Sequence, residues 1–143
     1  MSTAPIAYAG FWRRLGAALV DTLLILLITQ PLVVASYGWD YYDFDHEVFI
    51  AGPMDFLVCW LAPAVATVLF WQRLRATPGK LWLRCQVVDA RTGQALSTRQ
   101  ACIRYLGYFL STLALGLGFL WIAWDARKQG WHDKLAGSVV IRP

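Results

Sequence analysis

The apolar residues of this chain gather in three long blocks instead of alternating with polar residues. The blocks cover about residues 13–35, 54–71 and 105–124, and the third contains no charged side chain. A helix that crosses a bilayer needs about 20 predominantly apolar residues, so the first and third blocks are long enough and the second is marginal. Only 15% of the 143 residues are charged, whereas soluble domains contain about 25%. The sequence therefore predicts an all-α integral membrane protein with a single domain over residues 1–143.

Charged residues between the blocks predict how the chain is oriented. Residues 36–53 contain acidic side chains and no Lys or Arg, whereas residues 72–104 are rich in Arg. Loops that carry Lys and Arg stay on the cytoplasmic side of a membrane. We therefore expect an acidic outer loop over residues 36–53, a basic cytoplasmic connection over residues 72–104 and a cytoplasmic N-terminus.

Two short segments predict a small cytoplasmic β element. The stretch LWLRCQVVDARTGQALS contains a β-branched, partly alternating run and then a turn signal, Arg-Thr-Gly. The chain ends with AGSVVIRP, a second strand candidate. If the two segments pair, the C-terminus lies on the cytoplasmic side.

The third block has two alternative courses. If it crosses the membrane once, the tail lies outside, although it carries four basic residues: Arg127, Lys128, Lys134 and Arg142. The segment LALGLGF, residues 113–119, contains two glycines in the middle of the block. The block can therefore instead form a broken or re-entrant pair of short helices, which is tolerated at membrane depth where protein covers the backbone. Both courses remain open, and the basic tail favours the second.

Asp21 is a carboxylate inside the first apolar block, and Arg14 lies at the head of that block. An unpaired charge at the centre of a membrane helix costs roughly 2.5 to 3.5 kcal/mol on insertion scales. Arg14 is not expected to reach Asp21, because helical side chains lean toward the N-terminus; its expected partner is Asp133. Asp21 is then protonated or paired with a donor from another element. The candidate donors are Arg104, His132 and Lys134.

Three stretches of the chain occur in this order: FWRRLGAALVD, TPGKLWLRCQVVDARTGQALSTRQACIRY and RKQGWHDKLAGSVVIRP. Together they resemble the RDD family of bacterial membrane proteins, which is named for one arginine and two aspartates. The resemblance runs from about Tyr8 to Arg142 and implies that Arg14, Asp21 and Asp133 are the residues in question. It also implies a multi-pass protein of the bacterial cytoplasmic (inner) membrane, for which transport is the usual suggestion.

Two functions fit these features. In the first, the protein is a non-enzymatic structural or interaction module in which Arg14, Asp21 and Asp133 hold helices and tail together, because buried polar groups join membrane helices. In the second, it is a proton-coupled transporter or cation exchanger with Asp21 as the ion site, because an ionisable residue within a membrane is a functional candidate. Three short blocks are too few to enclose a pathway, so the transporter would be a homo-oligomer. Supporting roles are expected for three further residues, His132, Arg104 and Lys134.

Other function classes find little support. No Ser, Cys or second His stands at a spacing that specifies nucleophilic or metal chemistry, so we expect no enzyme activity, no cofactor and no metal. The net charge of +4 is assigned to topology and contact with anionic lipid, and no nucleic-acid-binding signature accompanies it. The expected partners are the lipid bilayer, a second copy or another membrane protein, and a proton or monovalent cation.

Overall fold

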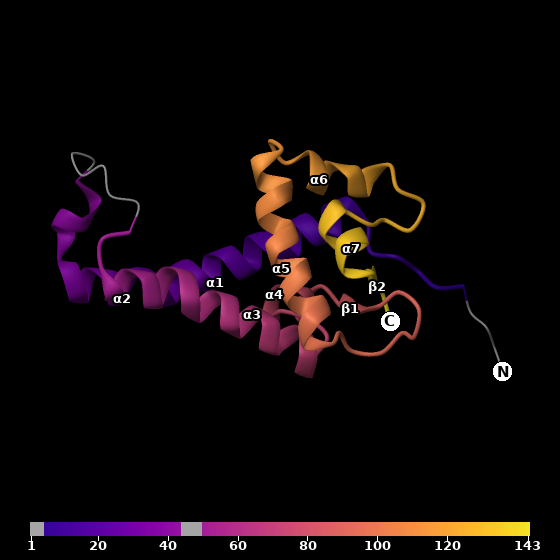
Figure 1. Ribbon diagram of the computed structural model, residues 1–143, viewed down its shortest axis with the longest axis horizontal. Coiled ribbons are helices and arrows are strands. Elements are labelled where there is room, and N and C mark those ends of the chain that lie inside the picture. Colours follow the sequence, from indigo (N-terminus) through magenta and orange to yellow (C-terminus); the bar gives the residue numbers. More distant parts are fainter. Residues whose placement is uncertain (1–4, 44–49) are drawn as a thin grey trace.

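The first two apolar blocks form long helices that lie side by side and project from the rest of the molecule (Figure 1). The computed structural model describes residues 5–43 and 50–143. Helix α1 (Phe11–Tyr37) contains the first block, and the helical segment Pro53–Arg73 contains the second. Both are long and apolar enough to cross a membrane. We call this helix pair the hairpin.

The second arm of the hairpin contains a local irregularity. It consists of α2 (Pro53–Asp55), a π-helical turn η2 (Phe56–Leu61) and α3 (Ala62–Arg73). The π-helical turn ends two residues before Pro63, which has no backbone N–H to donate to the preceding turn. Of the predicted acidic outer loop, residues 44–49 lie outside the described residues, and the described part contains a short 3₁₀ helix, η1 (Trp39–Tyr42).

The third apolar block is a broken helix. Helix α5 (Thr98–Leu113) begins seven residues before the predicted block, because Ser97 and Gln100 form a reciprocal capping box there. The chain then takes left-handed backbone conformations at Leu115 and Gly116, with φ of 59° and 78°. It continues as α6 (Leu117–Leu120) and the 3₁₀ helix η3 (Trp121–Ala123), bent by 110° from α5. The break lies within the predicted segment of residues 113–119.

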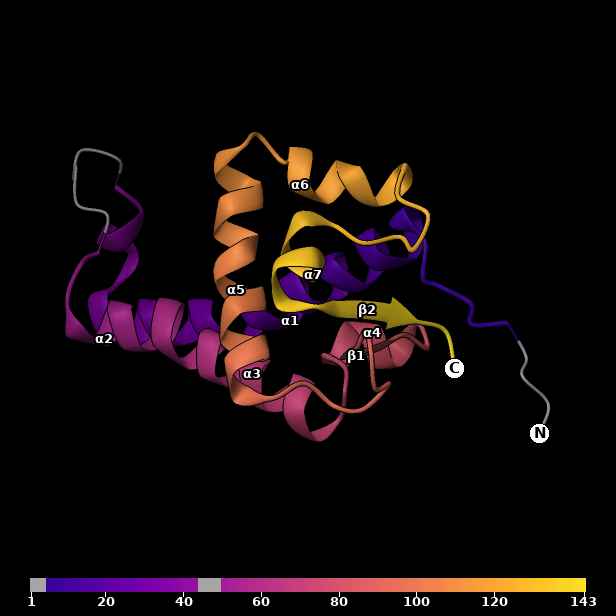
Figure 2. The same ribbon diagram turned by 45° about the vertical axis from the view of Figure 1, so that its right-hand side comes forward.

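The two predicted strands pair. Strand β1 (Gln86–Asp89) and strand β2 (Ser138–Ile141) are antiparallel, with Val87 opposite Val140. Two short helices flank them in sequence, α4 (Pro78–Trp82) before β1 and α7 (Trp131–Ala136) before β2. Figure 2 shows β2 between α7 and the region of β1 and α4. The C-terminus therefore lies beside the basic connection.

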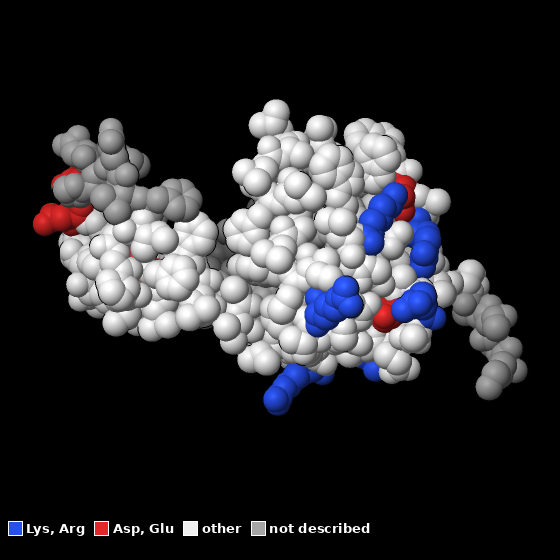
Figure 3. Space-filling view, in the orientation of Figure 1, with Lys and Arg blue, Asp and Glu red and all other residues white. Residues whose placement is uncertain are grey.

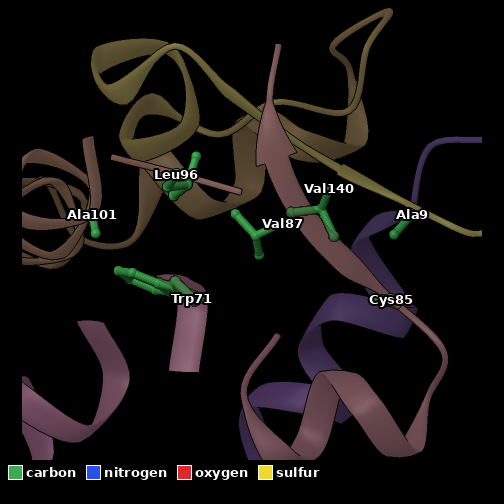
Figure 4. Packing of buried hydrophobic residues seen from close by; sticks show 7 residues of the cluster. All are labelled: Ala9, Trp71, Cys85, Val87, Leu96, Ala101 and Val140. Carbon is green, nitrogen blue, oxygen red and sulfur yellow. The ribbon is translucent and has the colours of Figure 1, made fainter. Parts of the chain in front are cut away.

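The residues after the hairpin form a packed body around a hydrophobic core that also includes Ala9 and the end of α3. Seven buried residues make up this core, and Figure 4 shows them between the sheet, the end of α3 and the start of α5: Ala9, Trp71, Cys85, Val87, Leu96, Ala101 and Val140. We call residues 74–143 the body. On the face in Figure 3, Lys and Arg gather over the body, whereas the hairpin shows acidic side chains only at its far end. The molecule is thus basic at one end and acidic at the other, with apolar helices between.

Candidate functional site

A buried ion network joins α1, α5 and α7 through the carboxylate of Asp133. Its Oδ2 lies 2.8 Å from Nη2 of Arg14, and its Oδ1 accepts a hydrogen bond from Nη1 of Arg104. The backbone N–H of Gly130 also donates to Oδ2, at 2.8 Å. Arg104 and Asp133 are both 0% exposed. The expected pair between Arg14 and Asp133 is therefore present, and Arg104 joins it as a second cation.

The two arginines determine the charge state of Asp133. Burial by itself would raise the pKa of Asp133, but the positive charges of Arg104 and Arg14 outweigh burial and hold that pKa far below its usual value. Asp133 is therefore ionised throughout the physiological pH range. Removing one partner of such a pair leaves the other charge buried without compensation, so the network couples the three helices strongly.

Arg104 extends the network to α3 and β2. Its guanidinium carbon lies 5.1 Å from the ring centre of Trp71 and 5.6 Å from that of Tyr108, where the ring faces attract a cation. Its Nη1 also donates a hydrogen bond to Oγ of Ser138 at 2.8 Å. Helices α5 and α7 approach closely here, since a Cβ on Gly107 would lie 2.7 Å from Cα of His132.

His132 is a neutral acceptor within the same network. Its Nε2 lies 2.9 Å from Nη2 of Arg14, and an arginine can only donate, so Nε2 carries no proton. Burial lowers the pKa of His132 well below its usual value, and the positive charges of Arg104 and Arg14 add to that effect. Nη1 of Arg14 donates to the carbonyl of Lys128 at 2.8 Å. Arg14 is thus held by the carboxylate, the imidazole and one backbone carbonyl.

Asp21 lies outside this network and is held by α4 and the residue before it. One carboxylate oxygen accepts a hydrogen bond from the Thr77 hydroxyl at 2.5 Å, and the other accepts one from the Gly79 backbone N–H at 2.7 Å. Gly79 allows this contact because a Cβ there would lie 2.1 Å from the carbonyl oxygen of Ala17. The TPGK segment therefore packs its backbone directly on α1.

The sequence-based choice of partners for Asp21 was wrong. Arg104 binds Asp133, His132 binds Arg14, and Lys134 pairs with Asp125 at 2.8 Å in a partly exposed ion pair. The physical reason is that the TPGK segment packs on α1 beside Asp21, whereas each of these three side chains has a partner elsewhere. One of the two donors to Asp21 is a backbone N–H. Every non-proline residue carries this group, so the side-chain pattern of the sequence cannot predict which one binds.

A second buried carboxylate, Asp55, was not among the predicted site residues. It is 1% exposed and accepts hydrogen bonds from the Tyr41 hydroxyl at 2.7 Å and from the Ala51 backbone N–H at 2.9 Å. The hydrogen bond between Tyr41 and Asp55 raises the pKa of the Tyr41 hydroxyl above its usual value, and burial adds to that effect. The signal for it was an acidic residue two positions after Pro53, where a helix begins.

A cavity of about 1060 Å³ lies between the hairpin and the body. Most of its wall is apolar and belongs to α1 and α3, but one end is polar. We use the name polar end for four polar residues of the lining, beside which His132 also lines the cavity: Arg14, Asp21, Thr77 and Lys80. Among the described residues no group of three or more His, Cys, Asp or Glu could hold a metal ion.

A family model described as the RDD family matches residues 8–137. The uncharacterized protein YxaI of Bacillus subtilis is 27% identical to this chain over 147 residues, which cover 93% of this chain and 96% of that protein. No solved structure matches the chain.

Two further relatives are matched over part of their length. An uncharacterized protein of Rickettsia prowazekii is 33% identical over 75 residues, covering 52% of this chain and 41% of that protein. The proline-rich antigen homolog of Mycobacterium tuberculosis is 33% identical over 63 residues, covering 44% of this chain and 26% of that protein. Because the family model covers nearly the whole chain, this protein belongs to the RDD family.

Proposed function

We propose that this protein is a non-enzymatic structural and interaction module of the membrane. The observation that carries the proposal is that both oxygens of Asp133 are occupied, by Arg14 and Gly130 on one side and by Arg104 on the other, at 0% exposure. A carboxylate held in this way does not exchange ions with solvent. It instead fixes the body against the hairpin, as buried polar groups do between membrane helices.

The surface of the hairpin supports a role in binding other membrane proteins or a second copy. In the most apolar window of each arm, 17% of the residues are buried inside the molecule. The remaining faces are free to meet lipid or the helices of a partner. With the body locked in place by Asp133, these faces are presented in one orientation.

Self-association of the purified protein in lipid nanodiscs tests the interaction role. We expect association that persists when the ratio of lipid to protein is raised, measured by energy transfer between labels on the exposed Cys102. Introducing a larger side chain on the outward face of the hairpin, as in Leu27→Trp, should reduce this energy transfer. Leu27 is 72% exposed, so the larger ring would disturb contact with a second copy. Transfer that falls to the random level on dilution with lipid would argue against association with a second copy.

A second function, that of a proton-coupled transporter or cation exchanger, is favoured by the place of Asp21. Its side chain is partly exposed and lines the polar end of the cavity. Under this alternative, Asp21 binds a proton or monovalent cation and the protein works as a homo-oligomer. The support is weaker, because the Thr77 hydroxyl and the Gly79 N–H already occupy both carboxylate oxygens.

Ion flux separates the two functions. The full chain is reconstituted in proteoliposomes, and proton movement is measured under imposed sodium or potassium gradients for the wild type and Asp21→Asn. Flux that disappears only in the variant would make Asp21 a transport site. No flux from folded wild type would support the structural and interaction module.

A further inference from the structure

We propose that the cavity between hairpin and body binds one anionic phospholipid, with its phosphate at Lys80 and its acyl chains along α1 and α3. The proposal rests on the membrane location of the hairpin. It does not depend on whether the protein binds a partner or moves an ion.

Lys80 is a buried cation without a partner. Its side chain is 7% exposed and lines the cavity. Within the described parts of the chain it makes neither a hydrogen bond nor an ion pair. Charged side chains are almost never buried unless they are paired. A lysine this buried, which lines a cavity and has no partner in the chain, therefore indicates that an anion from outside the chain completes the site.

The other charged groups of the polar end are already occupied. Arg14 is bound by Asp133, by His132 and by the carbonyl of Lys128. Asp21 is bound by the TPGK segment through both oxygens. The lining thus contains two cations and one anion, and Lys80 is the cation that has no ion-pair partner among the described residues. An anionic group bound there would contact Lys80 directly and gain from the nearby Arg14.

The rest of the wall fits hydrocarbon. The lining residues of α1 continue from Arg14 to Leu32, a helical length of about 27 Å, which compares with about 30 Å for the whole hydrocarbon core of a bilayer. Small side chains, among them Ala18 and Ala66, leave room along this wall. At about 1060 Å³, the cavity is at the upper end of the range of roughly 300 to 1,000 Å³ for sites of drug-sized ligands. Its shape therefore suits an amphiphile better than a small ion.

The position of the polar end agrees with the depth of a lipid headgroup. Lys80 follows the end of α3 by seven residues and lies at the body end of the hairpin, where Lys and Arg gather in Figure 3. Basic pockets between membrane helices bind anionic headgroups at this level. A free phosphate could pair with Lys80 but would leave the apolar part of the cavity unfilled, so the proposed occupant is a lipid.

Native mass spectrometry of the delipidated full chain tests the proposal. Phosphatidylglycerol, phosphatidylcholine and inorganic phosphate are titrated separately. We expect one phosphatidylglycerol per chain, bound about tenfold more tightly than phosphatidylcholine, because the cationic choline group of the latter offsets the phosphate charge that Lys80 attracts. Equal binding of the two lipids, or binding of inorganic phosphate as tight as that of phosphatidylglycerol, would overturn the proposal.

Four variants assign the binding to this cavity. Lys80→Gln should weaken phosphatidylglycerol binding about tenfold, and Lys80→Arg should retain it. Arg99→Gln removes the same charge from an exposed site outside the cavity lining and should change nothing. Ala66→Phe fills the exposed apolar wall without altering charge and should weaken lipid binding too.

Unfolding temperatures of all four variants check that folding is intact. If Lys80→Gln does not fold, Ala66→Phe decides the matter, since unchanged lipid affinity in that variant contradicts the proposed site. Equal losses in Lys80→Gln and Arg99→Gln would also contradict it, because they would indicate general attraction to the basic surface.

Discussion

Charged residues in and around the network differ in how much they contribute to stability. Asp133 has two arginine partners and one backbone donor, so its loss affects every element that the network joins. Lys134, its neighbour in sequence, is 45% exposed; it pairs with Asp125, and its ammonium lies 5.7 Å from the ring centre of Trp121. Exposed ion pairs contribute about 0–1 kcal/mol, whereas breaking a buried pair costs about 3–5 kcal/mol. Buried charged residues such as Asp133 are therefore expected to contribute more to stability than exposed ones such as Lys134.

The pair Arg14 and Asp133 should be strongly non-additive. We expect Arg14→Ala and Asp133→Ala each to destabilise the protein by about 3–5 kcal/mol. The double variant should be less destabilised than the sum by about 1 kcal/mol or more, because the partners are in contact. The measurement is the free energy of unfolding in mixed detergent micelles. The same cycle on Lys134 and Asp125 is the control, with a coupling near zero; equal coupling in both cycles would contradict the assigned role of burial.

His132 should make stability depend on pH above the range of the carboxylates. Its pKa is lowered in the folded state, so below the unfolded value of about 6.5 the unfolded chain binds more protons than the folded one. Stability therefore falls as the pH falls from about 7 to 5, by up to about 1.4 kcal/mol per pH unit. Asp133 adds nothing in this window, because its pKa is also lowered and its contribution is lost only below about pH 4.

The variant His132→Gln isolates this effect. Glutamine can still accept a hydrogen bond from Arg14 but does not titrate. Unfolding measured between pH 5 and 7 should show a flatter pH dependence for the variant than for the wild type. Parallel curves would mean that the pKa of His132 is the same in the folded and unfolded states, which contradicts the assigned environment.

Short elements rather than long helices determine how the molecule packs. Helix α4 has five residues, too few for a stable isolated helix, yet it supplies the backbone N–H that holds Asp21. Its contact with α1 depends on one glycine. The same holds for α5 and α7, which approach at Gly107. These close contacts fix the position of the body relative to the hairpin.

Gly79→Ala should disrupt the contact between α4 and α1. The new Cβ would lie 2.1 Å from the Ala17 carbonyl oxygen, so the backbone must move and the hydrogen bond from Gly79 to Asp21 is lost. We expect a destabilisation of about 1–3 kcal/mol or more, typical of overpacking, measured as the free energy of unfolding. Gly10→Ala is the control, because no atom lies within 4 Å of a Cβ there. Equal stability of the two variants would contradict the close packing of α4.

At the scale of the whole molecule, the apolar hairpin connects a basic body to an acidic end. The pairing of β1 with β2 brings the chain end beside the connection that follows the hairpin. Basic segments remain cytoplasmic, so we propose that both the N-terminus and the body lie on that side. The bend of 110° between α5 and the helices after it is compatible with a re-entrant course for the third block.

Cysteine labelling in intact cells tests this orientation. Cys102 is exposed on α5 and should react with a membrane-impermeant maleimide only after the membrane is permeabilised. Asp40→Cys, on the described part of the acidic loop, should react from outside in a background with Cys59→Ser and Cys102→Ser. Cys85 is buried, and burial raises the pKa of its thiol, so its labelling should be slow in either case. Labelling of Cys102 in intact cells would reverse the assigned orientation.

The sequence alone determined the features that depend on local composition. The length of the apolar blocks predicted two long apolar helices, the glycines of residues 113–119 marked where the third block could break, and β-branched runs predicted the two strands. Arg14 and Asp133 were also paired correctly. Their pairing could be predicted because Arg14 lies at the head of the first apolar block and Asp133 lies in the tail that was favoured on the same side of the membrane.

Only the tertiary structure decided which donors reach Asp21, where Arg104 binds and what surrounds Lys80. Every non-proline residue carries a backbone N–H, so the sequence does not reveal that the N–H of Gly79 binds Asp21 in place of a charged side chain. The cavity likewise belongs to no single segment, because its lining residues come from α1, α3, α4, α5 and the residues that follow α5. Local patterns record how residues partition between water and lipid, whereas the choice among nearby donors depends on distances that only the folded chain defines.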